Sequence, residues 1–279
     1  MKKRKMIKSK IKVGKKASLR KLESIPLKNM RKVHSKKIGG ISRNKKETRV
    51  SVGISNFDKL IEGGFEKNSI NMVLGTSGSG KSIFATQFLI EGMKKGEKCL
   101  YITFEEKKSR FYENMKDFGW DLQKYEDKGL FVFLEYTPAK VKTMLEEGGG
   151  QIESLVISNK VSRLVIDSIT SFALLFEDEL EKREAALSLF NMIREWSCTS
   201  ILTLEEEPRE DSRASSRALE FESDSIILLH FVRNKNTRIR SLEILKMRGT
   251  KHSKQIFEFD VTKKGIDLKK RALVNFKYM

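Results

Sequence analysis

One eight-residue segment restricts the fold of this 279-residue chain more than any other: Gly75-Thr76-Ser77-Gly78-Ser79-Gly80-Lys81-Ser82. It fits the pattern G-x-x-x-x-G-K-[ST] at every fixed position. The segment from Ile70 to Leu74 comes directly before it and is apolar enough for a strand buried on both faces. After it, apolar residues recur at helical spacing, at Ile83, Phe84, Phe88, Leu89 and Met93. The sequence therefore predicts a strand, a glycine-rich loop and a helix, in that order.

The residue types in this loop suit the binding of a phosphate chain. Glycines let consecutive backbone N–H groups turn toward one anion, and the N-terminus of the following helix adds the positive end of its dipole. The ammonium group of Lys81 supplies a charge for the β- and γ-phosphates, and the hydroxyl of Ser82 is placed to hold Mg²⁺. A glycine-rich turn next to a lysine is the alternative, but the flanking strand and helix favour a nucleoside triphosphate site.

The net charge of +19 is concentrated at the N-terminus. Residues 1–50 contain 20 Lys and Arg against two Glu, whereas residues 51–279 contain 36 basic and 35 acidic residues. Like charges at this density repel one another, and the scattered apolar residues cannot offset the entropy of ordering. We therefore expect a disordered basic arm over residues 1–48 and one domain over residues 49–279.

The sequence carries no pattern that would place the chain in or across a membrane. No segment is apolar for the length that a spanning helix needs, and no long apolar stretch follows the basic N-terminus as in a signal peptide. Cys99 and Cys198 are far apart and have no metal-binding spacing, which favours buried free thiols. These features predict a cytoplasmic protein.

Strand and helix patterns alternate through most of residues 49–279. We expect strands at 68–74, 98–103, 130–134, 163–167 and 200–204, and helices from the loop to about 95 and at 109–118, 152–160 and 179–196. This rhythm predicts an α/β fold, with a mostly parallel twisted sheet and helices on both faces. Three later strand patterns, at 225–231, 240–246 and 255–259, have no helix between them and predict an antiparallel C-terminal extension.

Carboxylates follow two of the predicted strands. Asp167 ends the apolar strand that contains Leu164 to Ile166, where a carboxylate beside a phosphate loop can hold Mg²⁺. Glu105 and Glu106 follow the second strand, and open parallel sheets place ligands at the carboxyl ends of their strands. A carboxylate there could orient the attacking water or accept its proton. From position alone, the glutamates could equally begin a solvated loop, and Asp167 could belong to a strand-end turn.

Four motifs in this order resemble the KaiC-type ATPases of the RecA superfamily. They are Gly53 to Asp58 with Gly63-Gly64-Phe65, Thr103-Phe104-Glu105-Glu106, Val165-Ile166-Asp167-Ser168 and Lys246-Met247-Arg248-Gly249-Thr250-Lys251-His252. The resemblance extends from about Val50 to Leu268. It implies a RecA-like P-loop fold of the archaeal single-domain type that binds ATP and Mg²⁺ and hydrolyses ATP. Glu105 and Glu106 then match the paired catalytic glutamates, and Lys81 the phosphate-loop lysine.

The resemblance also implies an active site that two subunits share. Lys246, Arg248 and His252 match residues that reach the nucleotide of the neighbouring subunit, where a cation stabilises charge on the transferred γ-phosphoryl. Exposed charges at a strand end and a histidine in a turn are the alternative. A homohexamer or another ring is the family expectation. The clock proteins of the family carry two such domains, whereas this chain has one and lacks a recognisable phosphorylated segment, so neither clock function nor autokinase activity is expected.

The basic arm could bind DNA or RNA, an anionic membrane or an acidic protein, or could only solubilise the chain. It contains no Trp, Tyr or Phe for base stacking, so binding to nucleic acid would be nearly independent of base sequence and sensitive to salt. The loop 205–217 carries five acidic and three basic residues and is a poor DNA contact. A DNA-dependent recombination or repair ATPase and a non-hydrolysing, ATP-gated signalling or assembly scaffold are the alternative functions.

Overall fold

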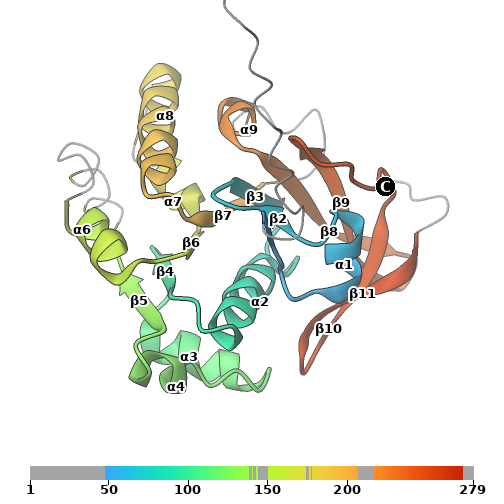
Figure 1. The fold of residues 1–279 in the computed structure, drawn as a ribbon. Coiled ribbons are helices and arrows are strands. Elements are labelled where there is room, and N and C mark those ends of the chain that lie inside the picture. Colours follow the sequence, from blue (N-terminus) through green and yellow to red (C-terminus); the bar gives the residue numbers. More distant parts are fainter. Residues whose placement is uncertain are drawn as a thin grey trace, which may run out of the picture. The chain divides into compact units, whose positions relative to one another are not determined.

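A nine-stranded sheet runs through the part of the chain that the computed structural model describes (Figure 1). The described residues are 48–137, 140, 143, 150–173, 176, 178–206 and 217–272. The basic arm predicted for residues 1–48 therefore lies, except for Thr48, outside the described residues. So do residues 207–216 of the polar loop.

The sheet has a parallel part of six neighbouring strands. In spatial order they are β5 (Phe131–Glu135), β4 (Cys99–Thr103), β6 (Arg163–Asp167), β7 (Thr199–Glu205), β3 (Ile70–Gly75) and β8 (Ser225–Asn234). β3 lies between β7 and β8, with Ile70 opposite Ser200 and Asn71 opposite Ser225. The predicted α/β fold with a mostly parallel sheet is confirmed.

The sheet continues beyond β8 with antiparallel strands. These are β9 (Thr237–Met247), β10 (Phe257–Thr262) and β11 (Gly265–Ala272). The predicted antiparallel extension is confirmed, but β11 was not expected, because its alternation is interrupted by the charged run from Lys269 to Arg271. Charged residues are typical of an edge strand, where they discourage pairing with another chain.

Helices cover both faces of the sheet (Figure 1). One apolar core contains side chains of α1 (Ser55–Leu60), α2 (Lys81–Lys94), α3 (Lys108–Lys116) and α4 (Leu122–Asp127). The other contains side chains of α6 (Gly150–Asn159), α7 (Ile169–Ala173), α8 (Glu179–Glu195) and α9 (Arg217–Glu222). Along β3, Val73 belongs to the first core, whereas Met72 and Leu74 belong to the second. Alternation between two buried faces explains why the strand is apolar throughout.

The segment before β3 forms a small lead-in structure. β1 (Arg49–Val50) pairs with β2 (Phe65–Glu66), and α1 lies between them in the chain. The Asp58 carboxylate accepts hydrogen bonds from the backbone N–H groups of Val52 (2.8 Å) and Gly53 (3.2 Å). A Cβ on Gly64 would lie 2.3 Å from the Val50 carbonyl oxygen, so only glycine fits there. These contacts give the sequence motif around Gly53 to Phe65 a structural reason.

Both cysteines are buried and unbridged, as predicted. Burial raises the pKa of Cys99 to about 12 and that of Cys198 to about 11, so neither thiol is a reactive nucleophile at neutral pH. Among the described helices, none is both long and apolar enough to cross a membrane.

Candidate functional site

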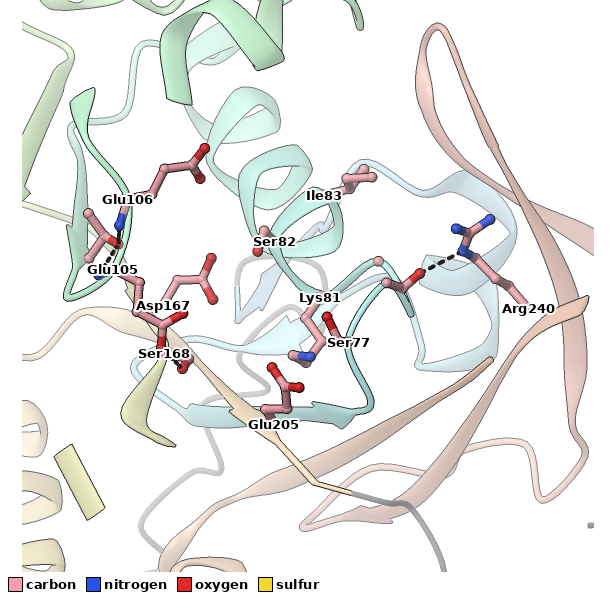
Figure 2. Close-up of a pocket in the computed structure, with 13 residues that line it drawn as sticks. Ser77, Lys81, Ser82, Ile83, Glu105, Glu106, Asp167, Ser168, Glu205 and Arg240 are labelled. Atoms are coloured by element: carbon pink, nitrogen blue, oxygen red, sulfur yellow. Dashed lines mark hydrogen bonds between the residues drawn. The ribbon is translucent and has the colours of Figure 1, made fainter. Parts of the chain in front are cut away.

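A pocket of 390 Å³ lies at the carboxyl ends of the parallel strands, directly above the phosphate loop (Figure 2). It is lined by Ser77, Gly78, Gly80, Lys81, Ser82, Ile83, Thr103, Glu105, Glu106, Asp167, Ser168, Glu205 and Arg240. The phosphate loop, both predicted catalytic glutamates and both predicted metal ligands thus meet in one place. The local order of strand, loop and helix is also as predicted, since β3 ends at Gly75 and α2 begins at Lys81.

The backbone of the loop adopts a conformation that favours glycine. Gly78 and Gly80 have φ angles of +75° and +105°, in the left-handed region. A Cβ on Gly75 would lie 2.3 Å from the Leu229 carbonyl oxygen of β8, because the loop leaves the sheet in close contact with that strand. Ser79 is fully buried, and its hydroxyl has no hydrogen-bond partner among the described residues. The fixed glycines of the motif are therefore required by geometry.

Lys81 folds back over the loop. Its Nζ donates to the carbonyl oxygens of Gly75 (2.9 Å) and Thr76 (3.0 Å). Burial lowers the pKa of Lys81, and the negative charges of Glu205, Asp167 and Glu105 oppose that shift. A phosphate oxygen is a stronger acceptor for an ammonium group than a carbonyl oxygen. The side chain is thus placed to transfer its hydrogen bonds to an anionic ligand.

Asp167 is held by two hydroxyl donors at the end of β6. Tyr101 Oη donates to its Oδ2 (2.5 Å), and Thr203 Oγ1 donates to its Oδ1. Tyr101 is buried, and burial together with the Asp167 charge raises its pKa, so the phenol remains a hydrogen-bond donor. Tyr101 also contacts the hydroxyl of Ser82. The two predicted metal ligands, Ser82 and Asp167, are therefore linked through one tyrosine.

The donors in this pocket suit Mg²⁺ bound together with a nucleotide. Among the described residues, no group of three or more His, Cys, Asp or Glu side chains forms a metal site on its own. Mg²⁺ commonly needs only one or two protein oxygen ligands, with substrate phosphates and water completing the shell. A hydroxyl from Ser82 and a carboxylate from Asp167, both lining the pocket, match that requirement.

Glu105 and Glu106 have different surroundings. Glu105 Oε1 accepts hydrogen bonds from Ser168 Oγ (3.1 Å) and Ser171 Oγ (2.6 Å), which follow β6. Glu106 Oε1 accepts one from Asn114 Nδ2 (2.9 Å) of α3, and its pKa is raised chiefly by burial and further by Asp167. Glu105 is thus fixed by the segment that directly follows β6, the strand that ends at the predicted metal ligand Asp167.

Two charged residues of the pocket were not among the sequence predictions. Glu205 ends β7 and pairs in register with Gly75, and Arg240 of β9 donates from Nε to the Gly78 carbonyl oxygen (3.0 Å). Glu205 could have been found from its position at a strand end, like Glu105. Arg240 lies 162 residues from Gly78 and belongs to an antiparallel strand, so no local pattern indicated it.

The structure does not bring Lys246, Arg248 and His252 into the pocket of their own chain. Lys246 Nζ donates to the carbonyl oxygens of Glu220 (2.6 Å) and Ser223 (2.7 Å), and Arg248 Nη2 donates to that of Phe221 (2.5 Å). His252 Nδ1 lies 3.0 Å from the carbonyl oxygen of the next residue. Their predicted role in a neighbouring subunit stays a prediction.

Comparison with known proteins points to one family. The family model described as "ATPase: KaiC" matches residues 50–272. The circadian clock protein KaiC3 of Synechocystis is 36% identical over 228 residues, which cover 78% of this chain and 45% of that protein. A UPF0273 protein of Pyrococcus furiosus is 32% identical over 231 residues, covering 78% of this chain and 92% of its own. The match thus spans less than half the length of KaiC3.

A solved structure gives the same result. The crystal structure of a KaiC-like protein from the hyperthermophilic archaeon Pyrococcus horikoshii has a TM-score of 0.71 with this chain at 35% sequence identity. The match covers 79% of this chain and 98% of that one. Nearly the whole archaeal chain therefore corresponds to the sheet and helices described above.

Proposed function

The chain belongs to the KaiC family of ATPases, and we propose that it binds ATP with Mg²⁺ at this pocket and hydrolyses it to ADP and phosphate. One observation carries the proposal: a phosphate loop, two oxygen donors suited to Mg²⁺ and two glutamates all line the same pocket. They come from separate strand ends, β3, β4 and β6, that only the parallel sheet brings together.

Binding would use the loop backbone, the helix end and Lys81. The N–H groups of the loop and of the first turn of α2 would donate hydrogen bonds to the phosphate chain. Lys81 Nζ would exchange its two carbonyl acceptors for oxygens of the β- and γ-phosphates. Because four carboxylates but only two cationic side chains line the pocket among the described residues, the ligand's negative charge requires a further cation.

Ser82 and Asp167 would hold that cation. When bound, Mg²⁺ would neutralise charge that develops on the β- and γ-phosphate oxygens. Tyr101 and Thr203 keep the Asp167 carboxylate oriented, and their hydrogen bonds favour its ionised form. The chain thus contributes both the ligands and the groups that position them.

Hydrolysis would be directed by Glu105. Its carboxylate would accept a hydrogen bond from a water molecule and aim it at the γ-phosphorus, so that the new O–P bond forms as the bond to the bridging oxygen breaks. ADP leaves with that oxygen, and the proton of the attacking water passes to Glu105 or to the phosphate. Glu106, whose pKa is raised by burial and by Asp167, would assist by holding a proton near the site.

We further infer that subunits assemble so that Lys246, Arg248 and His252 reach the pocket of a neighbour. The supporting observation is that none of the three lines the pocket of its own chain, although they match a motif of the family. A cation supplied across an interface would stabilise the γ-phosphoryl in the transition state and make turnover depend on assembly. A ring, such as a hexamer, would give every pocket such a neighbour.

Paired substitutions test the site. Lys81→Ala should abolish binding of a fluorescent ATP analogue, whereas Glu105→Gln should retain binding and lose phosphate release by about a hundredfold or more. Lys67→Ala and Glu113→Gln alter exposed residues outside the pocket and serve as matched controls. Unchanged binding in Lys81→Ala would refute the nucleotide site. Wild-type turnover in Glu105→Gln would show that Glu105 has no catalytic role and is an ordinary loop residue.

A further inference from the structure

The two ends of the pocket carry opposite charge. Glu105, Glu106 and Asp167 lie on one side of the phosphate loop, and Arg240 lies on the other, with Lys81 and Ser82 between them (Figure 2). If the site hydrolyses ATP as proposed above, the γ-phosphoryl must lie at the carboxylate side, next to the glutamate that orients water. The remainder of the nucleotide then extends toward Arg240.

Arg240 is held in place by two contacts. Its Nε donates to the Gly78 carbonyl oxygen (3.0 Å), and its guanidinium carbon lies 4.3 Å from the centre of the Phe231 ring. Phe231 pairs with Arg240 across β8 and β9 and supports the loop tip, since a Cβ on Gly78 would lie 3.5 Å from the ring. The cation therefore stacks on an aromatic surface built beside the phosphate loop.

The rest of this guanidinium group is available to a ligand. Neither Nη atom of Arg240 donates a hydrogen bond to another described residue. A planar guanidinium can donate two parallel hydrogen bonds to a phosphate, and a side chain already fixed by stacking loses little entropy when it does so. The only cation nearer to the γ-phosphate position among the described lining residues is Lys81.

We propose that Arg240 binds the phosphates of the nucleotide that are not transferred, and so sets affinity for ATP and ADP alike. The proposal rests on the proposed function, because it uses the same pocket. It makes Arg240 a binding residue supplied by its own chain, distinct from any cation supplied by a neighbour. Contacts that persist unchanged from ATP to ADP lower the dissociation constant and KM without raising kcat.

The chain offers a matched control in Arg238. Its guanidinium lies 5.3 Å from the centre of the same Phe231 ring, but Arg238 is exposed and does not line the pocket. Arg240→Ala and Arg238→Ala each remove one positive charge from the same strand, but only Arg240 lines the pocket. Arg240→Lys keeps the charge and removes the planar guanidinium. Thermal unfolding of each variant shows whether the fold is kept.

The experiment measures dissociation constants for Mg-ATP and Mg-ADP, together with kcat, on the full chain. Arg240→Ala should weaken both nucleotides by the same factor, about tenfold to a hundredfold, with kcat at saturating ATP within about twofold of wild type. Arg240→Lys should restore only part of the affinity, because an ammonium cannot donate two parallel hydrogen bonds. Arg238→Ala should bind as wild type does. At high salt, the difference in nucleotide affinity between the wild-type chain and Arg240→Ala should become smaller, as expected for a direct charge contact.

Several results would overturn the proposal. Wild-type affinity in Arg240→Ala would show that the side chain does not bind the ligand. A loss confined to ATP would place it on the transferred γ-phosphate, and an equal loss in Arg238→Ala would reduce the effect to the charge of the strand. If the loss of nucleotide affinity in Arg240→Ala did not depend on salt, Arg240 would act only by supporting the loop at Gly78. If the wild-type chain bound neither nucleotide, the proposed function itself would fail.

Discussion

Asp58 lies in α1, in the lead-in structure before β3, and its pKa is strongly shifted. Burial raises its pKa from the usual 3.8 to about 6, with Glu91 adding to the shift and the N–H groups of Val52 and Gly53 opposing it. The folded chain thus holds a proton that the unfolded chain releases at lower pH. Stability from this group is fully present below about pH 4 and is lost as pH rises through about 6.

Asp58→Asn should therefore change the pH dependence of stability. The wild-type free energy of unfolding, taken relative to that of the variant, should fall between pH 4 and pH 7 by up to about 3 kcal/mol, which is an upper bound because Asp58 retains some solvent contact. Denaturant unfolding across this pH range measures the difference. Asn56→Ala, in the same helix, removes a hydrogen bond to the Leu268 carbonyl oxygen and should cost stability equally at every pH. If the free energy of unfolding of the wild type, relative to that of Asp58→Asn, instead rose with pH, the predicted direction would be wrong.

At the residue scale, local motifs predicted many of the residues that line the pocket and missed those that arrive from distant strands. Lys81 and Ser82 follow from one contiguous pattern, and Asp167 follows from an apolar strand with a carboxylate at its end. Tyr101 and Arg240 reach the site only because β4 lies beside β6 and because β9 folds back along β8. Those pairings depend on topology, which a linear pattern does not contain.

The helix α9 depends on a residue far along the chain. Its last turn is capped by Lys246, whose ammonium group donates to the carbonyl oxygens of Glu220 and Ser223, and by Arg248, which donates to that of Phe221. A cation at a helix C-terminus also interacts favourably with the helix dipole. Burial lowers the pKa of Lys246, with Arg248 adding to the shift. In this chain the family motif therefore has a structural role as well as the one proposed across an interface.

Lys246→Met should loosen α9 without disturbing the sheet. Methionine keeps most of the aliphatic length but donates no hydrogen bond, so the last carbonyl groups of the helix lose their partner at a local cost of about 1–2 kcal/mol. Hydrogen exchange of the amides in 217–223 should speed up accordingly. Lys254→Met, an exposed lysine outside this cap, is the control. Unchanged exchange in α9 would mean that water or Arg248 alone suffices.

How well each helix or strand was predicted depended on its length and apolar content. The long helices and the fully buried strands were located to within a few residues, because their periodicity is sustained. The six-residue helices α1, α4 and α9 are too short to show a period, and their side chains take their register from neighbouring elements. β11 was missed because its alternation ends after Leu268 in a charged run, which suits its position at the edge of the sheet.

At the scale of the whole molecule, the proposed active site would be shared between two chains. The pocket contains the groups that we propose for nucleotide binding, metal coordination and water orientation, but Lys246 and Arg248 lie elsewhere in the same chain. Assembly cannot be read from one sequence, because only a second copy shows where these cations reach. The basic arm likewise remains a prediction, since it lies outside the described residues.

Mixing two inactive variants tests the shared site. Arg248→Ala keeps Glu105 but lacks the arginine that a neighbour would receive, and Glu105→Gln keeps the arginine but cannot orient water. If Arg248 acts across an interface, an equal mixture should regain about a quarter of wild-type phosphate release, because random pairing places an intact Glu105 beside an intact Arg248 at that frequency. A mixture no more active than its components would refute a contribution from the neighbour.

The position of β3 between β7 and β8 has a consequence for the order of events on the ribosome. Synthesis completes β3 before its neighbours in the sheet, which come about 130 and 155 residues later in the chain. Until β7 (Thr199–Glu205) has emerged, the apolar strand that carries the loop has no sheet partner on either side, and its second partner, β8, begins only at Ser225. The nascent chain therefore lacks both sheet partners of that strand while residues 76–198 are made, and a nucleotide bound as proposed could stabilise the fold only after β8 has joined the sheet.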